Sequence, residues 1–126
     1  MNKLEFETYC KEFSDWSDKA EFFDRYYDHN AVFEHPGKGT FKGKKDIVDF
    51  WTAGHQGIHE VLKPINVLIE GNRLAAEVRV EWHCLEDTDY YGPREKGSVY
   101  HAECAGFFHS KDGKIIRVKI YLAQTT

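Results

Sequence analysis

The sequence predicts an α+β protein in which N-terminal helices pack on one face of a curved antiparallel sheet and enclose a pocket. Apolar residues recur at helical spacing up to about residue 57 and alternate along the later segments. Asp112-Gly113, near the end of the chain, is a strong signal for a two-residue hairpin turn. With 126 residues the chain fits one domain, 1–126, which can bury enough surface to need no disulfide or metal.

The first half of the chain is expected to form helices separated by one short strand. A stripe of apolar residues at spacings of three and four predicts the first helix, and its members are Phe6, Tyr9, Cys10, Phe13 and Trp16. Ser17 is the expected N-cap of a second helix that carries Phe23 and Tyr27. Residues 31–34 are expected to form a strand and residues 36–39 a loop. A third helix should run from about residue 44 to 55, where glycines end it.

The second half alternates between apolar and polar residues, as strands do. One predicted strand, 59–69, has apolar residues at alternate positions, namely Val61, Ile65, Val67 and Ile69. The next, 74–85, has an apolar face formed by Leu74, Ala76, Val78, Val80 and Trp82. Two further strands, 99–109 and 115–123, flank the Asp-Gly turn. The other face of the sheet is either solvated or a polar dimer surface, and its charges are Glu77, Arg79, Glu81, Arg117 and Lys119.

The hairpin turn gives a prediction about one carboxylate, Glu103. If the turn has two residues, Glu103 pairs with Leu122 and shares the apolar, helix-covered face of the sheet. A carboxylate there is costly unless it is paired or protonated, and burial would raise its pKa as a general acid requires. Glu103 is then either such an acid or a group hydrogen-bonded to a helix side chain or to the backbone. An odd number of turn residues would move it to the other face.

Composition excludes several classes of protein. Nine Phe, seven Tyr and three Trp suffice to fill a core and to line a ligand cavity as well. The net charge is −4 and the basic residues form no long run, so we expect no nucleic-acid partner. No apolar run approaches ~18 residues and the first eleven residues do not resemble an export signal. We therefore expect a cytoplasmic protein without a membrane partner.

Neither a metal site nor a cofactor is expected. The cysteines are odd in number and form no CxxC pair, which favours free thiols; they are Cys10, Cys84 and Cys104. His55 and His59 have the i,i+4 spacing of a metal-binding helix, but Gly57 between them breaks that helix. No motif for a nucleotide cofactor or for a serine nucleophile is present.

Several short segments resemble a known family. Residues 23–36, FDRYYDHNAVFEHP, resemble the segment after the second helix of SnoaL-like and ketosteroid isomerase-like proteins, which belong to the nuclear transport factor 2-like superfamily. Residues 39–43, the helix at 44–51 and the hairpin at 112–115 are similar to later passages of that family. The resemblance implies a cone-shaped sheet around helices, with a pocket inside, and often a dimer. It also implies isomerisation, dehydration, cyclisation or epoxide opening without a cofactor, or ligand and protein binding alone.

The resemblance further implies a pair of catalytic residues. His35 stands just before the proline, where ketosteroid isomerases have an aspartate that acts as base, and histidine can make the same proton transfer. Glu103 is the nearest acid to the one that these isomerases carry on the strand before the last hairpin. The isomerases' first-helix tyrosine falls on Lys11, between Tyr9 and Phe13, which departs from their pattern.

The leading hypothesis is a cofactor-independent isomerase, dehydratase or cyclase that acts by proton transfer on a small hydrophobic carbonyl compound. His35 would be its base and Glu103 its acid. The expected substrate-binding residues are Tyr9, Trp16, Phe23, Trp51, Val80, Trp82, His101 and Phe107. We also expect a homodimer formed through the charged outer face. The alternative is a non-catalytic module of the same fold, and catalysis would require His35 and Glu103 to meet in one cavity.

Overall fold

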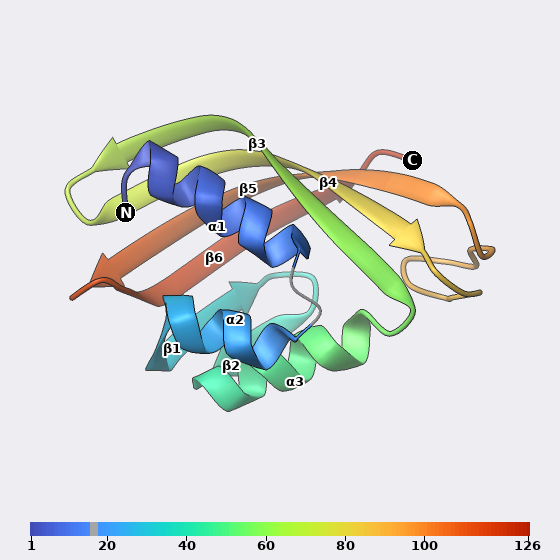
Figure 1. The fold of residues 1–126 in the computed structure, drawn as a ribbon, viewed down its shortest axis with the longest axis horizontal. Coiled ribbons are helices and arrows are strands. Elements are labelled where there is room, and N and C mark those ends of the chain that lie inside the picture. Colours follow the sequence, from blue (N-terminus) through green and yellow to red (C-terminus); the bar gives the residue numbers. More distant parts are fainter. Residues whose placement is uncertain (16–17) are drawn as a thin grey trace.

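A computed structural model describes residues 1–15 and 18–126, and in them helices precede most of the strands (Figure 1). The helices are α1 (Lys3–Asp15), α2 (Lys19–Tyr26) and α3 (Lys44–Gly54). The strands are β1 (Tyr27–His35), β2 (Gly39–Lys42), β3 (Ile58–Glu70), β4 (Arg73–Cys84), β5 (Val99–Lys111) and β6 (Lys114–Gln124). No helix of the described ranges is both long and apolar enough to cross a membrane.

The predicted α+β class is confirmed, with the helices on the inner face of one curved sheet (Figure 1). The strand order is β2-β1-β6-β5-β4-β3. The sheet is mixed and not wholly antiparallel, because β1 pairs in parallel with β6. Strand β2 was not expected, since residues 36–39 were predicted as a loop and residues 40–42 were assigned to no strand; residues 39–42 pair with the end of β1 as a short hairpin.

The helix ends are satisfied by side chains close in sequence. At the start of α1, Asn2 Oδ1 accepts from the Glu5 backbone N–H at 2.8 Å and Glu5 Oε1 accepts from that of Asn2 at 3.1 Å, which is a capping box. The N-cap of α2 is Asp18 and not the expected Ser17, since the Asp18 side chain accepts from the Glu21 N–H at 3.3 Å. Residues 16 and 17, including the predicted pocket residue Trp16, lie outside the described residues.

The β5–β6 hairpin contains a bulge that inverts one prediction. The turn has two residues, as predicted, with left-handed φ angles of 52° at Asp112 and 79° at Gly113. The register then shifts, because Ser110 pairs with Ile115 but His109 pairs with Arg117. Ile116 is therefore an extra residue in β6, and every pair farther along is displaced by one position.

The displaced register changes which residues of β5 face the helices. Leu122 pairs with Cys104 in place of Glu103, and Val118 pairs with Phe108 in place of Phe107. Glu103 and Phe107 are exposed on the outer face. The predicted inward orientation of both is wrong, because opposed residues share a face only while the register holds.

A second bulge lies in β3, next to Pro64. The pairing with β4 shifts between Pro64 and Asn66, which makes Ile65 the extra residue. The alternating apolar residues therefore do not share one face: Val61 pairs with the outward Glu81 and Ile65 is 52% exposed, whereas Val67 and Ile69, beyond the bulge, pair with the buried Ala76 and Leu74. Before the bulge the even-numbered residues face inward, so Glu60 lies opposite Trp82 on the inner face.

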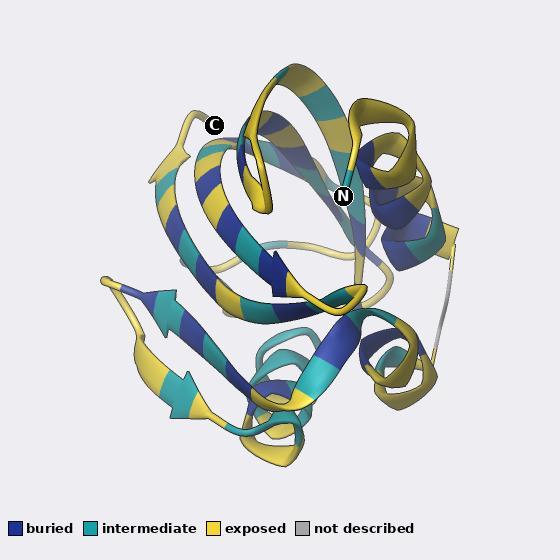
Figure 2. Cartoon of the chain, turned by 90° about the vertical axis from the view of Figure 1, so that its left-hand side faces the viewer, coloured by how far each residue is buried: buried dark blue, intermediate teal, exposed yellow. Residues whose placement is uncertain are grey.

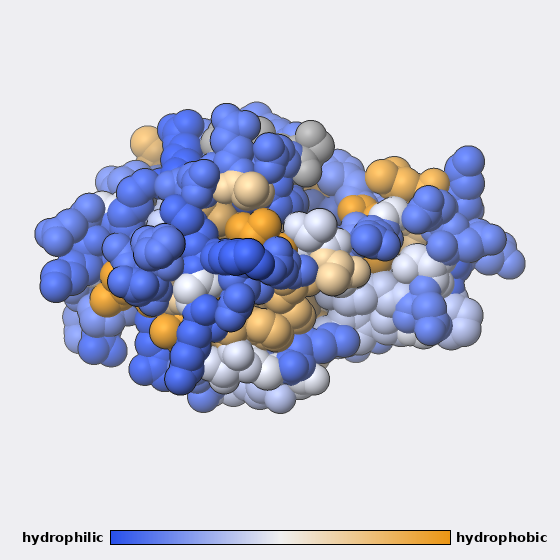
Figure 3. Space-filling view, turned by 90° about the horizontal axis from the view of Figure 1, so that it is seen from below, coloured by the Kyte–Doolittle hydropathy of each residue, from blue (hydrophilic) through white to orange (hydrophobic). Residues whose placement is uncertain are grey.

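The core lies between the helices and the inner face of the sheet. Buried and exposed residues alternate along β4 and β5, which appears as dark and light bands in Figure 2. The apolar face predicted for residues 74–82 is buried as expected. Each large apolar side chain buried there contributes about 1.5–3 kcal/mol. Figure 3 shows the molecule from below, which is the side of helices α2 and α3. This surface is mostly hydrophilic, with scattered apolar patches.

Candidate functional site

A cavity of about 70 Å³ lies inside the cone, between the helices and the sheet. A single water needs about 10–15 Å³ by this kind of measure, so the cavity has room for a small molecule. Its walls are mainly aromatic: Phe6, Tyr9, Phe13, Phe23, Tyr27, Phe33, Phe50, Trp51, Trp82, Tyr90 and Phe108. Aliphatic side chains of β3, β4 and β6 complete the lining, which suits an apolar ligand.

His35, the last residue of β1, brings an imidazole to this apolar wall. Its exposure is 7%, and its Nδ1 is buried without a hydrogen-bond partner among the described residues. Burial lowers the pKa of His35, and the positive charge of Lys38 lowers it further; a contact with its own backbone and the carboxyl of Glu60 oppose this in part. The ring is therefore neutral at neutral pH and can accept a proton.

Glu60 is a buried carboxylate that the sequence did not predict as a site residue. It lines the cavity and is only 6% exposed. Its Oε2 accepts a hydrogen bond from Trp82 Nε1 at 2.8 Å and lies 2.5 Å from His55 Nε2. His55 follows α3, and its Nδ1 lies 2.9 Å from the Trp51 carbonyl oxygen. We call Glu60, His55 and Trp82 the Glu60 cluster.

The two bulges explain why the sequence did not predict Glu60 in the cavity and why it wrongly predicted that Glu103 faces inward. The alternation of apolar residues in 59–69 favoured the odd positions, whereas Glu60 is even and faces the cavity. The available signal was Pro64, because a proline inside a strand often marks a bulge. In β6 the signal was the adjacent apolar pair Ile115 and Ile116, which interrupts the alternation at the bulge.

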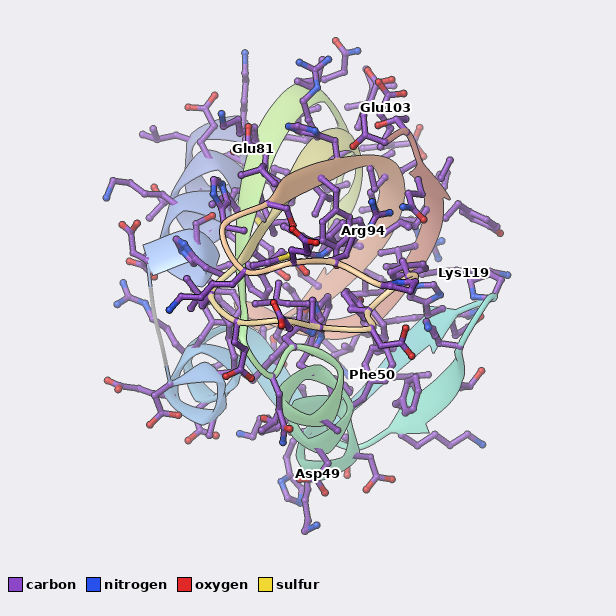
Figure 4. All side chains as sticks on the ribbon, turned by 90° about the vertical axis from the view of Figure 1, so that its right-hand side faces the viewer. Asp49, Phe50, Glu81, Arg94, Glu103 and Lys119 are labelled. Carbon is purple, nitrogen blue, oxygen red and sulfur yellow. The ribbon has the colours of Figure 1, made fainter. Side chains whose placement is uncertain are left out.

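The cavity adjoins a surface hollow of about 300 Å³, and both are lined by His35 and Leu122. The β1–β2 turn and the β4–β5 loop border this hollow. Lys38 Nζ, on the turn, lies 4.6 Å from the ring centroid of Tyr91, and Tyr91 stacks on Trp82 at 5.3 Å. His35 therefore stands between the interior and the surface. Arg94 marks the same loop, which crosses this end of the molecule in Figure 4.

The structure brings most of the predicted site residues to the cavity wall: His35, Tyr9, Phe23, Trp51, Val80 and Trp82. His101 is not among the lining residues; its backbone N–H donates to Thr126 Oγ1 at 2.7 Å, at the end of the chain. Glu103 and Phe107 are absent from the cavity for the reason given above, and Figure 4 shows Glu103 and Lys119 on the outside of the sheet. The predicted meeting of His35 and Glu103 does not occur.

Other titratable groups near the cavity are neutral at neutral pH. The hydroxyls of Tyr9 and Tyr27 lie 2.7 Å apart, and burial raises the pKa of both well above the ordinary value. Burial also raises the pKa of Cys104 to about 12, which leaves an unreactive thiol. Cys10 and Cys84 are likewise free cysteines. Within 1–15 and 18–126, no group of three His, Cys, Asp or Glu is placed to hold a metal ion.

Solved structures share this fold. A candidate polyketide cyclase from Xanthomonas campestris pv. campestris has a TM-score of 0.77 and 22% identity, over 92% of this chain and 85% of that one. Another, from Pseudomonas putida KT2440, has a TM-score of 0.73 and 26% identity, over 90% of this chain and 84% of that one. A protein with a ketosteroid isomerase-like fold from Catenulispora acidiphila, in complex with trimethylamine, has a TM-score of 0.73 and 9% identity, over 96% and 85%.

The likeness extends to proteins of different activities, since other matching structures are a candidate hydroxylase and an epoxide hydrolase. No curated protein matches the sequence. The family model of the SnoaL-like domain matches residues 7–118, which is most of the chain. The chain therefore belongs to the SnoaL-like family and has its ketosteroid isomerase-like fold.

Proposed function

We propose that this protein is a cofactor-independent enzyme that moves a proton next to a carbonyl group in a small, largely apolar compound, as an isomerase, dehydratase or cyclase does. The observation that carries the proposal is His35. It is a buried, neutral imidazole in the wall of an aromatic cavity, and no described residue hydrogen-bonds to its Nδ1. A group in that state can take a proton from a bound molecule and return it.

The residues around the cavity also suit the other needs of such a reaction, which are substrate binding, exclusion of water and access to His35. Aromatic walls bind the apolar part of the substrate and exclude water, which strengthens electrostatic interactions inside. His35 lies beside the entrance, so a substrate entering from the surface hollow passes its ring. Membership of the SnoaL-like family, and the candidate polyketide cyclases among similar structures, favour carbonyl substrates.

The proposal is tested by exchange of carbon-bound protons. Acetone, cyclohexanone and acetophenone are incubated with the protein in D₂O, and ¹H NMR follows the loss of signal next to the carbonyl. We expect accelerated exchange for at least one ketone. In His35→Gln the exchange rate should fall by at least about 100-fold. His101→Gln, which changes a histidine outside the cavity, should behave like the wild type. Equal exchange in wild type and His35→Gln would reject His35 as the base.

The second candidate function is a non-catalytic ligand-binding module. It is favoured by the absence of Glu103 from the cavity, since the two groups first expected to act together lie on opposite faces. A module would bind the same ketones, seen as ¹H–¹⁵N chemical-shift changes in the cavity residues. It would accelerate no exchange, and His35→Gln would leave its affinity within about threefold of the wild type.

We also propose a homodimer formed through the outer face of the sheet. A hollow of about 640 Å³ crosses that face, and exposed Phe107 and Tyr121 lie in it beside Arg117 and Lys119. Apolar side chains among charges suit a two-fold contact in which one patch must complement itself. Sedimentation should give a dimer for the wild type and a monomer for Phe107→Glu. A wild-type monomer at all concentrations would reject the dimer.

A further inference from the structure

We infer that the Glu60 cluster holds one exchangeable proton and donates it, through Glu60, to an oxygen atom of the substrate in the cavity. The inference rests on the proposed function, for which it names a second catalytic residue and the polar group that the substrate must carry. It depends on three observations: the hydrogen bonds of His55, the position of Glu60, and the indole N–H of Trp51, for which the described residues supply no acceptor.

The hydrogen bonds of His55 require two ring hydrogens or a protonated carboxyl. Nδ1 lies 2.9 Å from the Trp51 carbonyl oxygen, which can only accept, so Nδ1 carries a hydrogen. Nε2 lies 2.5 Å from Glu60 Oε2, and a hydrogen must lie between these atoms as well. The pair therefore holds one hydrogen more than a neutral ring and a free carboxylate hold. Trp82 Nε1 donates to the same oxygen and fixes the carboxyl in place.

Glu60 is the member of the pair that reaches the ligand. Both contacts end on Oε2, and no described residue donates to Oε1. Glu60 lines the cavity, whereas His55 does not. The side chains of both are nine-tenths buried, so water competes little for the proton. A proton on the pair can therefore pass through the Glu60 carboxyl into the cavity, and His55 is the positioning residue behind it.

The substrate's polar group should be a hydrogen-bond acceptor. Trp51 also lines the cavity, and its Nε1 is buried without a partner among the described residues. An indole N–H can only donate, so it requires an acceptor that the described residues do not supply. A carbonyl oxygen can accept from both Trp51 and Glu60 through its two lone pairs. The lining thus favours a small ketone or aldehyde over an amine or a hydrocarbon.

The proton transfers balance without an oxidant or a reductant. His35 takes the proton from the carbon next to the carbonyl, that C–H electron pair forms the C=C bond, and the carbonyl oxygen receives the proton from Glu60. The product of this step is an enol, protonated His35, and a Glu60 cluster with one proton fewer. Return of the proton from His35 to carbon, with return of the O–H proton to Glu60, regenerates both groups. Where the carbonyl compound has a C=C bond at its β and γ carbons, the enol is a dienol, and return of the proton to the γ carbon moves the double bond and isomerises the compound.

Glu60→Gln is the informative variant because it removes the proton store with little change of shape. Both contacts end on Oε2, so the amide keeps one of them in place: its oxygen accepts from Trp82, or its N–H donates to His55 Nε2. The matched control is Glu103→Gln on the outer face. We expect exchange in D₂O to fall about 100-fold in Glu60→Gln with little change in KM, and to remain unchanged in the control. Acetate should restore part of the activity of Glu60→Ala, whose cavity can hold it.

A second measurement does not depend on activity. In ¹H–¹⁵N spectra of labelled wild type, the hydrogen between His55 and Glu60 should appear as a strongly downfield signal, and it should vanish in Glu60→Gln. Normal exchange in Glu60→Gln, or no such signal in the wild type, would overturn the inference and leave His35 as the base. Failure of the wild type to accelerate exchange with any ketone would overturn the proposed function and this catalytic role together.

Discussion

The inner and outer faces of the sheet are built from the same strands but differ in whether their charged side chains are buried or exposed. On the outer face Glu103 and Arg79 are exposed on paired positions of β5 and β4. On the inner face Glu60 is buried, and its carboxyl is held by His55 and Trp82. A carboxylate in water needs no partner, whereas a buried one is costly without hydrogen bonds. Burial and partners, more than residue type, therefore distinguish a site residue from a surface residue here.

The comparison also identifies the atoms that a ligand should contact. On the outer face, charged groups form exposed ion pairs, such as Arg117 with Glu34, and such pairs contribute about 0–1 kcal/mol each. In the interior, His35 Nδ1 of β1 and Trp51 Nε1 of the covering helix α3 are buried and have no partner among the described residues. A buried polar atom without a hydrogen bond costs about 1–3 kcal/mol. A ligand that satisfies both atoms would recover that free energy on binding.

Inserting one alanine between Ile116 and Arg117 should have the largest effect, because the bulge already takes up one extra residue and a second one displaces every later pair of β6. Val118, Ile120 and Leu122 would turn outward and lose about 1.5–3 kcal/mol each, while Arg117 and Lys119 would turn inward. The summed loss is comparable with the whole free energy of unfolding of a typical domain, about 5–15 kcal/mol. We expect an unfolded or aggregated chain by circular dichroism.

The matched control for the insertion is Ile116→Ala, which keeps the residue count and therefore the register. Ile116 is only partly buried, so we expect a native fold with a loss below about 2 kcal/mol in urea denaturation. An insertion variant that unfolds cooperatively at nearly the wild-type urea concentration would show that β6 can slide without cost.

Sequence reasoning succeeded where local patterns were regular. The helices at residues 6–13 and 44–54, the inner face of β4, and the turn at residues 112–113 follow from periodicity and turn chemistry alone. It failed where the sheet bends. A bulge depends on how two strands pair in three dimensions, and one extra residue, Ile116 or Ile65, exchanges the faces of everything beyond it.

The residues of the candidate site also separate into those that regular patterns or the family resemblance predicted and those that depend on strand pairing. His35 was found because its surrounding segment resembles that of a family, and the aromatic wall was found because its residues follow regular periods. Glu60 was missed because its parity is set by the β3 bulge, and β2 was missed because four residues beside two glycines resemble a loop. The parallel pairing of β1 with β6 has no local signal, since it joins segments more than 80 residues apart.

Two adjacent phenylalanines of β5 give the next largest effect. Phe108 faces inward and packs edge-on against Phe6 at 5.3 Å and near Tyr9 at 5.8 Å, so Phe108→Ala should cost about 3–5 kcal/mol in urea denaturation. Phe107 is 54% exposed, so Phe107→Ala should cost less than about 1 kcal/mol. Similar losses for the two variants would contradict the register that we describe.

The pH dependence of stability should report the burial of His35. Because its pKa is lower in the folded state than in the unfolded chain, the unfolded state takes up a proton first as the pH falls below about 6.5. His35 therefore destabilises the fold as the pH drops through that range, by at most about 1.4 kcal/mol per pH unit, and contributes nothing above it.

His35→Gln should remove this contribution and flatten the stability profile between the two pKa values of His35. The comparison is urea denaturation from pH 7.5 down to about 5, with His29→Gln as the control on an exposed histidine. Any catalysed exchange should fall over the lower part of the same range, since the neutral ring is the active form. An unchanged profile in His35→Gln would mean that this ring is not desolvated.

The smallest expected effect concerns an outer-face pair, Lys63 and Glu81, whose charged atoms lie 2.8 Å apart. The hydrogen bond from Lys63, and then that from His83, lowers the pKa of Glu81. The resulting stability is present above the ordinary carboxyl pKa and is lost as the pH falls through the lowered one. Lys63 is 56% exposed, so solvent screens the pair and the coupling should be only about 0.2–1 kcal/mol.

A double-mutant cycle with Lys63→Met and Glu81→Gln should measure the coupling by urea denaturation at neutral pH. The coupling should approach zero in about 1 M salt, where charges are screened within about 3 Å. A coupling above about 2 kcal/mol that salt does not reduce would mean that this part of the outer face is covered in solution, and the two faces of the sheet would then differ less than we conclude.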